Sequence, residues 1–102
     1  MENLIKEMTE AGVVPVVKID NADDAVSLAA ALRKGGINCA EITFRTDAAE
    51  ESIKRISTEF PDMLIIAGTV LTPKQADKAI AAGAKAIVSP GLNPIIVRHC
   101  IE

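Results

Sequence analysis

The sequence predicts an α/β protein with a parallel sheet. Short β-branched runs alternate along the chain with longer segments whose apolar residues recur at helical spacing. Each connecting segment is long enough for the crossover of about a dozen residues that joins parallel strands. No linker or low-complexity stretch interrupts the 102 residues, so we expect residues 1–102 to form a single domain.

The composition suits helices packed on a buried sheet. Hydrophobic residues make up 49% of the chain, whereas Trp and Tyr are absent and Phe occurs twice, so Ala, Val, Ile and Leu must build the core. A formal net charge of -3 gives no basic surface, which argues against a nucleic-acid partner. No apolar run approaches the ~20 residues of a membrane helix, and residues 1–10 contain acids where a signal peptide has basic residues. We therefore expect a cytoplasmic protein without a membrane partner.

Four apolar runs bounded by turn residues are the predicted strands, and they cover residues 13–18, 37–44, 63–67 and 84–89. The first run is mostly valine, which indicates burial on both faces, although Pro15 requires an irregular start. The third run leads directly into Gly68 and Thr69, and the fourth precedes a Pro-Gly turn.

Five helices are predicted around these strands from their ends and their apolar stripes. The first helix covers residues 1–11 and stops at Gly12, and the last begins at Asn93 or Pro94 and runs toward Glu102. Each of the three helices between them has a residue that caps its start and one that ends it: Asp20 or Asn21 with Gly35, Thr46 or Asp47 with Pro61, and Thr72 with Gly83. The clearest signal is Thr72-Pro73-Lys74-Gln75, because a Thr cap, Pro at the first helical position and Gln three residues after the cap form a capping box.

Functional groups of a parallel sheet gather at the carboxyl ends of its strands. Period-2 alternation places Glu41, Thr43 and Arg45 on one face of the second strand, whose other face is apolar. A solvated edge strand would explain this row, but helices flank the strand, which favours a polar face that looks into a barrel. The other strand ends contribute Lys18, which we expect to reach water, Gly68-Thr69 and Ser89-Pro90-Gly91.

Several kinds of site are disfavoured. Gly68 is the single glycine of IIAGTVLTP, too few for a P-loop or a dinucleotide turn. Cys39 and Cys100 form no CxxC pair, so we expect two small buried side chains rather than ligands or a disulfide. His99 has no companion ligands and is expected at the surface or in packing. We therefore expect neither a metal nor a cofactor.

Four segments, VVPVVKI, GGINCAEITFRT, IIAGTVLTPKQADKAIAAGA and AIVSPGLNP, resemble the first half of the bacterial 2-keto-3-deoxy-6-phosphogluconate aldolase / 4-hydroxy-2-oxoglutarate aldolase family. One small departure is IAGTVLTP, where many members have GAGTVL. The resemblance implies an N-terminal helix and four βα units that form half of a (β/α)8 TIM barrel.

The resemblance also implies a class I aldolase of carbohydrate metabolism, in the Entner-Doudoroff route. Such an enzyme cleaves 2-keto-3-deoxy-6-phosphogluconate to pyruvate and glyceraldehyde 3-phosphate, 4-hydroxy-2-oxoglutarate to pyruvate and glyoxylate, or both. By position, Glu41 resembles the general acid/base and Arg45 the clamp on the pyruvoyl carboxylate; Thr69 resembles a second contact there, and Pro90 lies in a loop beside the site. The family's Schiff-base lysine lies in the second half of the barrel, and no lysine of this chain matches it.

Four parallel strands cannot close a barrel, so strand edges stay unpaired. Three outcomes are open: the N-terminal part of a longer enzyme, a non-catalytic half-barrel module that assembles through its open strand edges, or an open sheet that repacks in a flavodoxin-like way. The expected partners are a pyruvate-type keto acid and either further copies of the chain, a trimer by resemblance, or a C-terminal half-barrel.

Overall fold

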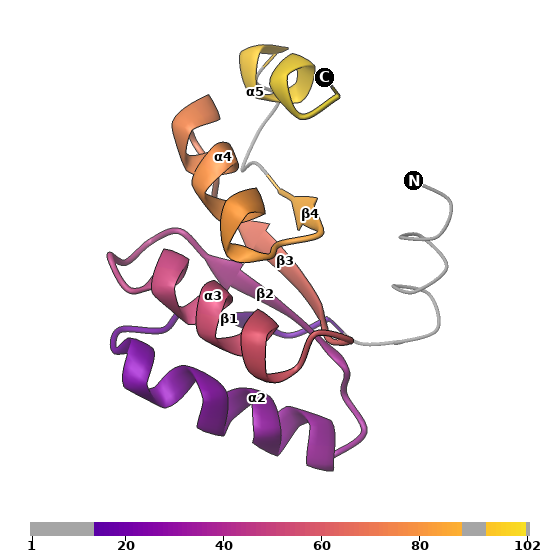
Figure 1. Cartoon of the computed structure of the whole chain (residues 1–102). Helices are drawn as coiled ribbons and strands as arrows, with labels where there is room; N and C mark the ends of the chain where they lie inside the picture. Colours follow the sequence, from indigo (N-terminus) through magenta and orange to yellow (C-terminus); the bar gives the residue numbers. More distant parts are fainter. Residues whose placement is uncertain (1–13, 89–93, 102) are drawn as a thin grey trace.

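The computed structural model describes residues 14–88 and 94–101 (Figure 1). Its strands are β1 (Val16–Val17), β2 (Cys39–Thr43), β3 (Leu64–Gly68) and β4 (Ala86–Ile87). Its helices are the 3-10 turn η1 (Ala22–Asp24), α2 (Ala25–Lys34), α3 (Ala49–Glu59), α4 (Pro73–Ala82) and α5 (Pro94–Ile101). The helix predicted over residues 1–11 and the turn at Ser89-Pro90-Gly91 lie outside the described residues.

The four strands form one parallel sheet in the order β1-β2-β3-β4. β2 and β3 pair along five residues, from Cys39 with Leu64 to Thr43 with Gly68, whereas β1 and β4 each contribute two paired residues. α2, α3 and α4 lie along the same face of this sheet (Figure 1). A flavodoxin-like sheet has the order 2-1-3-4-5 and helices on both faces. The described sheet therefore confirms the parallel α/β prediction and excludes flavodoxin-like repacking.

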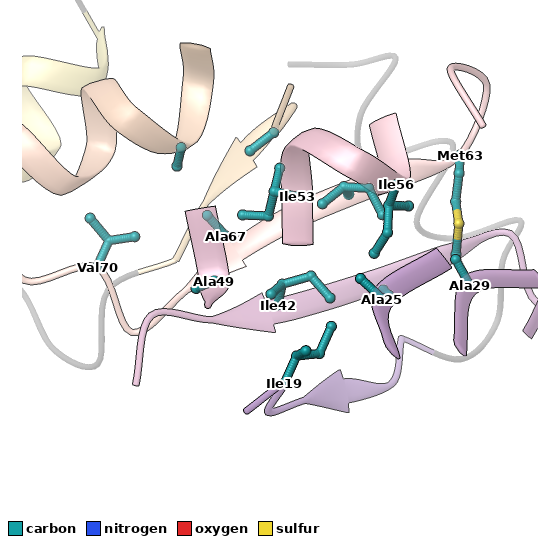
Figure 2. Packing of buried hydrophobic residues seen from close by; sticks show 14 of the residues in the cluster. Ile19, Ala25, Ala29, Ile42, Ala49, Ile53, Ile56, Met63, Ala67 and Val70 are labelled. Atoms are coloured by element: carbon teal, nitrogen blue, oxygen red, sulfur yellow. The ribbon is translucent and has the colours of Figure 1, made fainter. Parts of the chain in front are cut away.

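The main core lies between the sheet and these three helices (Figure 2). It contains side chains from every second position of β2 and β3 and from the inner faces of the helices, among them Ala25, Ala29, Ala40, Ile42, Ile53, Ile56, Ile65, Ala67, Ala76 and Ala79. The predicted apolar stripes are thus confirmed, and Leu28, Leu32, Phe44 and Phe60 pack partly buried against this core. Small alanines bring the helix backbones close to the sheet.

The third helix starts later than predicted. It begins at Ala49 rather than near Thr46 or Asp47, and Ala48 at its N-cap offers no side-chain hydrogen bond. The hydroxyl of Thr46 instead donates to the carbonyl oxygen of Ile19, which ties this loop to the end of β1. A long-range contact therefore occupies the hydroxyl that local sequence suggested as a cap.

The second helix also differs at its start. Asn21 caps the short turn η1, where its Oδ1 accepts from the backbone N–H of Asp23 at 2.9 Å, and α2 follows from Ala25. The Thr72 cap of α4 and Pro73 at its first position are confirmed: Thr72 Oγ1 accepts from the N–H of Gln75 at 3.1 Å. The Gln75 side chain accepts from Leu71 N–H at 2.8 Å, one residue before the cap.

Arg33 joins the amino-terminal ends of β2 and β3 to α2. Its guanidinium donates to Asn38 Oδ1 at 2.6 Å and to both carboxylate oxygens of Asp62 at 3.0 and 3.3 Å. It also lies 4.8 Å from the ring centroid of Phe60, within cation-π distance. The hydrogen bonds from Arg33 lower the pKa of Asp62 below its ordinary value, because they favour the ionised carboxylate.

We predict that Arg33→Gln raises the pKa of Asp62 toward its ordinary value near ~3.9. The Asp62 pKa is lower in the folded chain than in the unfolded chain, so the pair stabilises above the unfolded pKa and loses this effect as pH falls through the folded pKa. The stability difference between wild type and Arg33→Gln should thus shrink on acidification. NMR titration of the Asp62 carboxyl and urea unfolding at several pH values measure both effects. Lys34→Gln is the control, and equal Asp62 pKa values in wild type and Arg33→Gln would contradict the prediction.

We predict that Ile53→Ala destabilises the chain by about 3 kcal/mol, because it empties a fully buried site between α3 and the sheet. The matched control is Ile80→Ala on α4, where the side chain is 52% exposed and the expected change is within about 0.5 kcal/mol. Urea unfolding of the two variants compares them directly. Equal losses would show that Ile53 does not hold α3 to the sheet.

Candidate active site at the carboxyl end of the sheet

Glu41 lies in the middle of β2 on the face opposite the helices, since its neighbours Ala40 and Ile42 belong to the helix-side core. Its side chain is partly buried and extends over Gly68 at the end of β3. A Cβ placed on Gly68 would lie 2.7 Å from Cδ and 2.8 Å from Cγ of Glu41, and closer still to Oε1. The Glu41 carboxyl group therefore occupies space that only a glycine at position 68 leaves free.

The polar row predicted for the second strand ends at Thr43. Thr43 is buried, and its hydroxyl donates to the carbonyl oxygen of Val17 at 3.4 Å, a long bond between β2 and β1. The backbone then turns: Phe44 N–H donates to the carbonyl oxygen of Gly68 at 2.8 Å, and Arg45 lies in the turn beyond the strand. Period-2 alternation therefore does not place Arg45, because β2 has ended before it.

Arg45 is exposed and lines an open hollow of about 240 Å³ between the β2–α3 loop and the amino-terminal parts of α3 and α4. The other lining residues are Phe44, Thr46, Asp47, Glu50, Gln75 and Lys78. Sequence reasoning did not single out Lys78. Their spacing in the sequence could have indicated that Lys78 lies beside Gln75, because residues three apart on α4 share one helix face.

Thr69 adopts a left-handed backbone conformation, with φ of 56°. This region is rare for a β-branched residue and costs of order 1–3 kcal/mol. Hydrogen bonds hold the chain on both sides: Gly68 O accepts from Phe44 N–H at 2.8 Å, and Val70 N–H donates to Val88 O at 3.2 Å. These bonds attach the end of β3 to segments on either side of it, so the kink at Thr69 is imposed by the sheet.

The remaining predicted residues lie elsewhere. Lys18 reaches water as expected and pairs with Asp20 at 3.7 Å, whereas Pro90 lies outside the described residues. Cys39 is buried as predicted, and burial raises the pKa of its thiol. The prediction for Cys100 was wrong, because its side chain is exposed near the end of α5. His99 bonds Asp77 at 2.6 Å and so links α5 to α4.

Residues 14–88 and 94–101 contain neither a cluster of metal-ligand side chains nor a helix that could span a membrane. In this part of the chain no three His, Cys, Asp or Glu side chains converge as metal ligands. None of the helices there has the length and apolar character to cross a membrane.

A comparison with protein families matches residues 4–102 to the family described as KDPG and KHG aldolase. The chain belongs to the KDPG and KHG aldolase family. This match covers nearly the whole chain, and it includes Glu41, Arg45, Thr69 and Pro90.

Individual relatives support the same family assignment. The chain is 50% identical over 101 residues to the 2-dehydro-3-deoxy-phosphogluconate aldolase of Treponema pallidum, covering 99% of this chain and 48% of that protein. It is 48% identical over 99 residues to the same-named enzyme of Haemophilus influenzae, covering 97% and 47%. It also matches the solved structure of the Legionella pneumophila KDPG aldolase, which holds pyruvate as a covalent carbinolamine, with 42% identity, TM-score 0.80 and coverage of 84% and 42%.

This member of the KDPG and KHG aldolase family therefore spans about half the length of the relatives it matches. Its sequential parallel sheet, with helices on one face, has the arrangement of half of a TIM barrel. In such a barrel the face opposite the helices points inward, and Glu41 lies on that face.

We predict that Thr69→Gly stabilises the chain by about 1 kcal/mol, because glycine adopts the left-handed region without the penalty paid by a β-branched residue. Thr69→Val retains the β-branch and should leave stability within about 0.5 kcal/mol of wild type. Thermal and urea unfolding measure both changes. A destabilised Thr69→Gly variant would mean that the strain at Thr69 is smaller than the conformational entropy that glycine adds to the unfolded chain.

Proposed function

We propose that this chain forms the acid/base half of a class I aldolase that cleaves 2-keto-3-deoxy-6-phosphogluconate, 4-hydroxy-2-oxoglutarate, or both, and releases pyruvate. The observation that carries this proposal is the position of Glu41, partly buried in the middle of β2 on the face opposite the helices, with its side chain extending over Gly68 at the end of β3. The names of the relatives and the pyruvate carbinolamine of the Legionella enzyme support the substrate class.

In the proposed mechanism, the Schiff-base lysine comes from a second set of four βα units such as the relatives carry. Glu41 moves protons between the carbinolamine, the imine and the enamine, which requires a carboxyl group positioned beside the reacting carbons. The protonated Schiff base accepts the electrons of the broken carbon-carbon bond, so the reaction needs neither a metal nor a cofactor.

Arg45, Thr69 and Pro90 are the proposed substrate contacts. Arg45 forms no ion pair within the described residues, so its guanidinium is available for a bidentate contact with the pyruvoyl carboxylate. Thr69 holds a hydroxyl at the end of β3, beside Gly68 and therefore next to the space that Glu41 occupies. Pro90 is proposed to lie in the loop after β4 on the same rim.

The sheet edges support a partner that completes the barrel. Within the described residues β1 and β4 each have one neighbouring strand, and Val16 on β1 is 66% exposed. Unpaired strand edges favour association. We propose that a C-terminal half-barrel covers these edges, and that the completed barrel forms homo-oligomers, trimers by family resemblance, in the cytoplasm.

A chimera tests this function: residues 1–102 replace the corresponding N-terminal half of the Treponema pallidum relative. We expect the chimera to release pyruvate from 2-keto-3-deoxy-6-phosphogluconate or 4-hydroxy-2-oxoglutarate, measured by coupled lactate dehydrogenase. Pyruvate with borohydride should trap an adduct in the C-terminal half. Glu41→Gln should lower kcat by about 10²–10⁴-fold, because the proton shuttle is lost. Glu59→Gln, at an exposed carboxylate at the end of α3, is the control.

Two outcomes would reject the proposal. A folded chimera that neither releases pyruvate nor forms an adduct would show that this half does not serve the aldol reaction. Full activity in Glu41→Gln would remove Glu41 from its proposed role. The competing non-catalytic module predicts that residues 1–102 alone self-associate as concentration rises, and a monodisperse monomer in sedimentation would exclude it.

A further inference from the structure

We propose that Gly68 is a positioning residue for Glu41: by lacking a side chain, it lets the carboxyl group lie across the end of β3. This inference deepens the proposed function and rests on the role given there to Glu41. Its structural basis is the space shared by these two residues of neighbouring strands.

Steric space, rather than backbone conformation, requires glycine at this position. The glycines with positive φ in the described residues are Gly36 and Gly83, and Gly68 is not among them. An alanine could therefore adopt the backbone of Gly68 without strain. Its Cβ, however, would meet Oε1, Cδ and Cγ of Glu41, the three closest neighbours of that position.

The register explains why this glycine and this carboxylate meet. Glu41 pairs with Ile66 and Thr43 pairs with Gly68, so Gly68 lies one pleat further along the same face. A side chain at Gly68 would point to this face, as Ile66 does. With a hydrogen at that position, the Glu41 side chain extends toward the carboxyl ends of the strands, where the catalytic groups of such barrels gather.

Backbone hydrogen bonds on either side of Thr69 hold this glycine in place. The carbonyl oxygen of Gly68 accepts from Phe44 N–H on one side, and the N–H of Val70 donates to Val88 O on the other. The left-handed conformation of Thr69 joins these two attachment points. Backbone hydrogen bonds thus fix the end of β3, and the glycine there leaves room for the flexible Glu41 side chain.

The test uses residues 1–102 and the variant Gly68→Ala. The added Cβ obstructs only the outer atoms of a flexible side chain, so we expect the variant to fold and Glu41 to rotate away. NMR with ¹³C-labelled glutamate, assigned with Glu41→Gln, should show a displaced Glu41 carboxyl resonance. The contacts between the Glu41 γ protons and the α protons of residue 68 should be lost. Gly35→Ala is the control, because its Cβ would lie 3.5 Å or more from its nearest neighbours.

In the chimera, Gly68→Ala should lower kcat about 10–100-fold, as expected when a catalytic group is displaced by about 1 Å, with a smaller change in KM. Glu41→Gln combined with Gly68→Ala should be no slower than Glu41→Gln alone, because both changes act through one carboxyl group. An inactive chimera would reject the proposed function, while the NMR experiment would still decide the positioning role.

An unchanged Glu41 resonance in folded Gly68→Ala would overturn the proposal. The proposal would also be overturned if Gly68→Ala unfolded both with Glu41 present and in a Glu41→Ala background. In that case glycine would be required by the backbone at position 68 and not by the Glu41 carboxylate. Recovery of the fold only in the Glu41→Ala background would support it, since the two residues would compete for the same space.

Discussion

The rest of the structure depends on the burial of one face of the β2–β3 pair beneath the helices. Ile42 and Ala67 must face the helix-side core with α3, and the two-residue period of a strand then sends Glu41 to the opposite face. A slip of one residue would place the Glu41 carboxylate among Ile53 and Ile56, at the cost of burying a charge without a partner. Apolar packing on one face therefore sets the orientation of the polar group on the other.

The carboxyl end of β3 is where this arrangement becomes chemically useful. Hydrogen bonds to Phe44 and Val88 hold the chain on both sides of Thr69, and the sheet thereby sustains a backbone conformation that an isolated segment would leave. The same segment presents a glycine beneath the Glu41 carboxyl group. The strained backbone of Thr69 and the glycine that makes room for Glu41 thus lie side by side at the rim where we place the proposed aldol reaction.

The order and type of the elements were predictable because they depend on neighbours within a few residues. The Thr72 cap and the apolar stripes of α2 and α3 were correct for that reason. Local signals failed where a distant group competes for the same atom. Thr46 does not cap α3, because its hydroxyl bonds Ile19 at the end of β1. Arg45 lies outside the strand, in a turn that follows the last bond between these segments, from Phe44 N–H to Gly68 O.

The sequence by itself determined the βα alternation and the polar face with Glu41, which follow from local spacing, and the family, which follows from the similarity of the chain to known aldolases. The tertiary structure decided which side chains share space. The position of Glu41 over Gly68, the left-handed Thr69 and the bonds of Arg33 to Asn38 and Asp62 all join segments far apart in the chain. Strand register and helix packing create these contacts, so no local pattern in the sequence contains them.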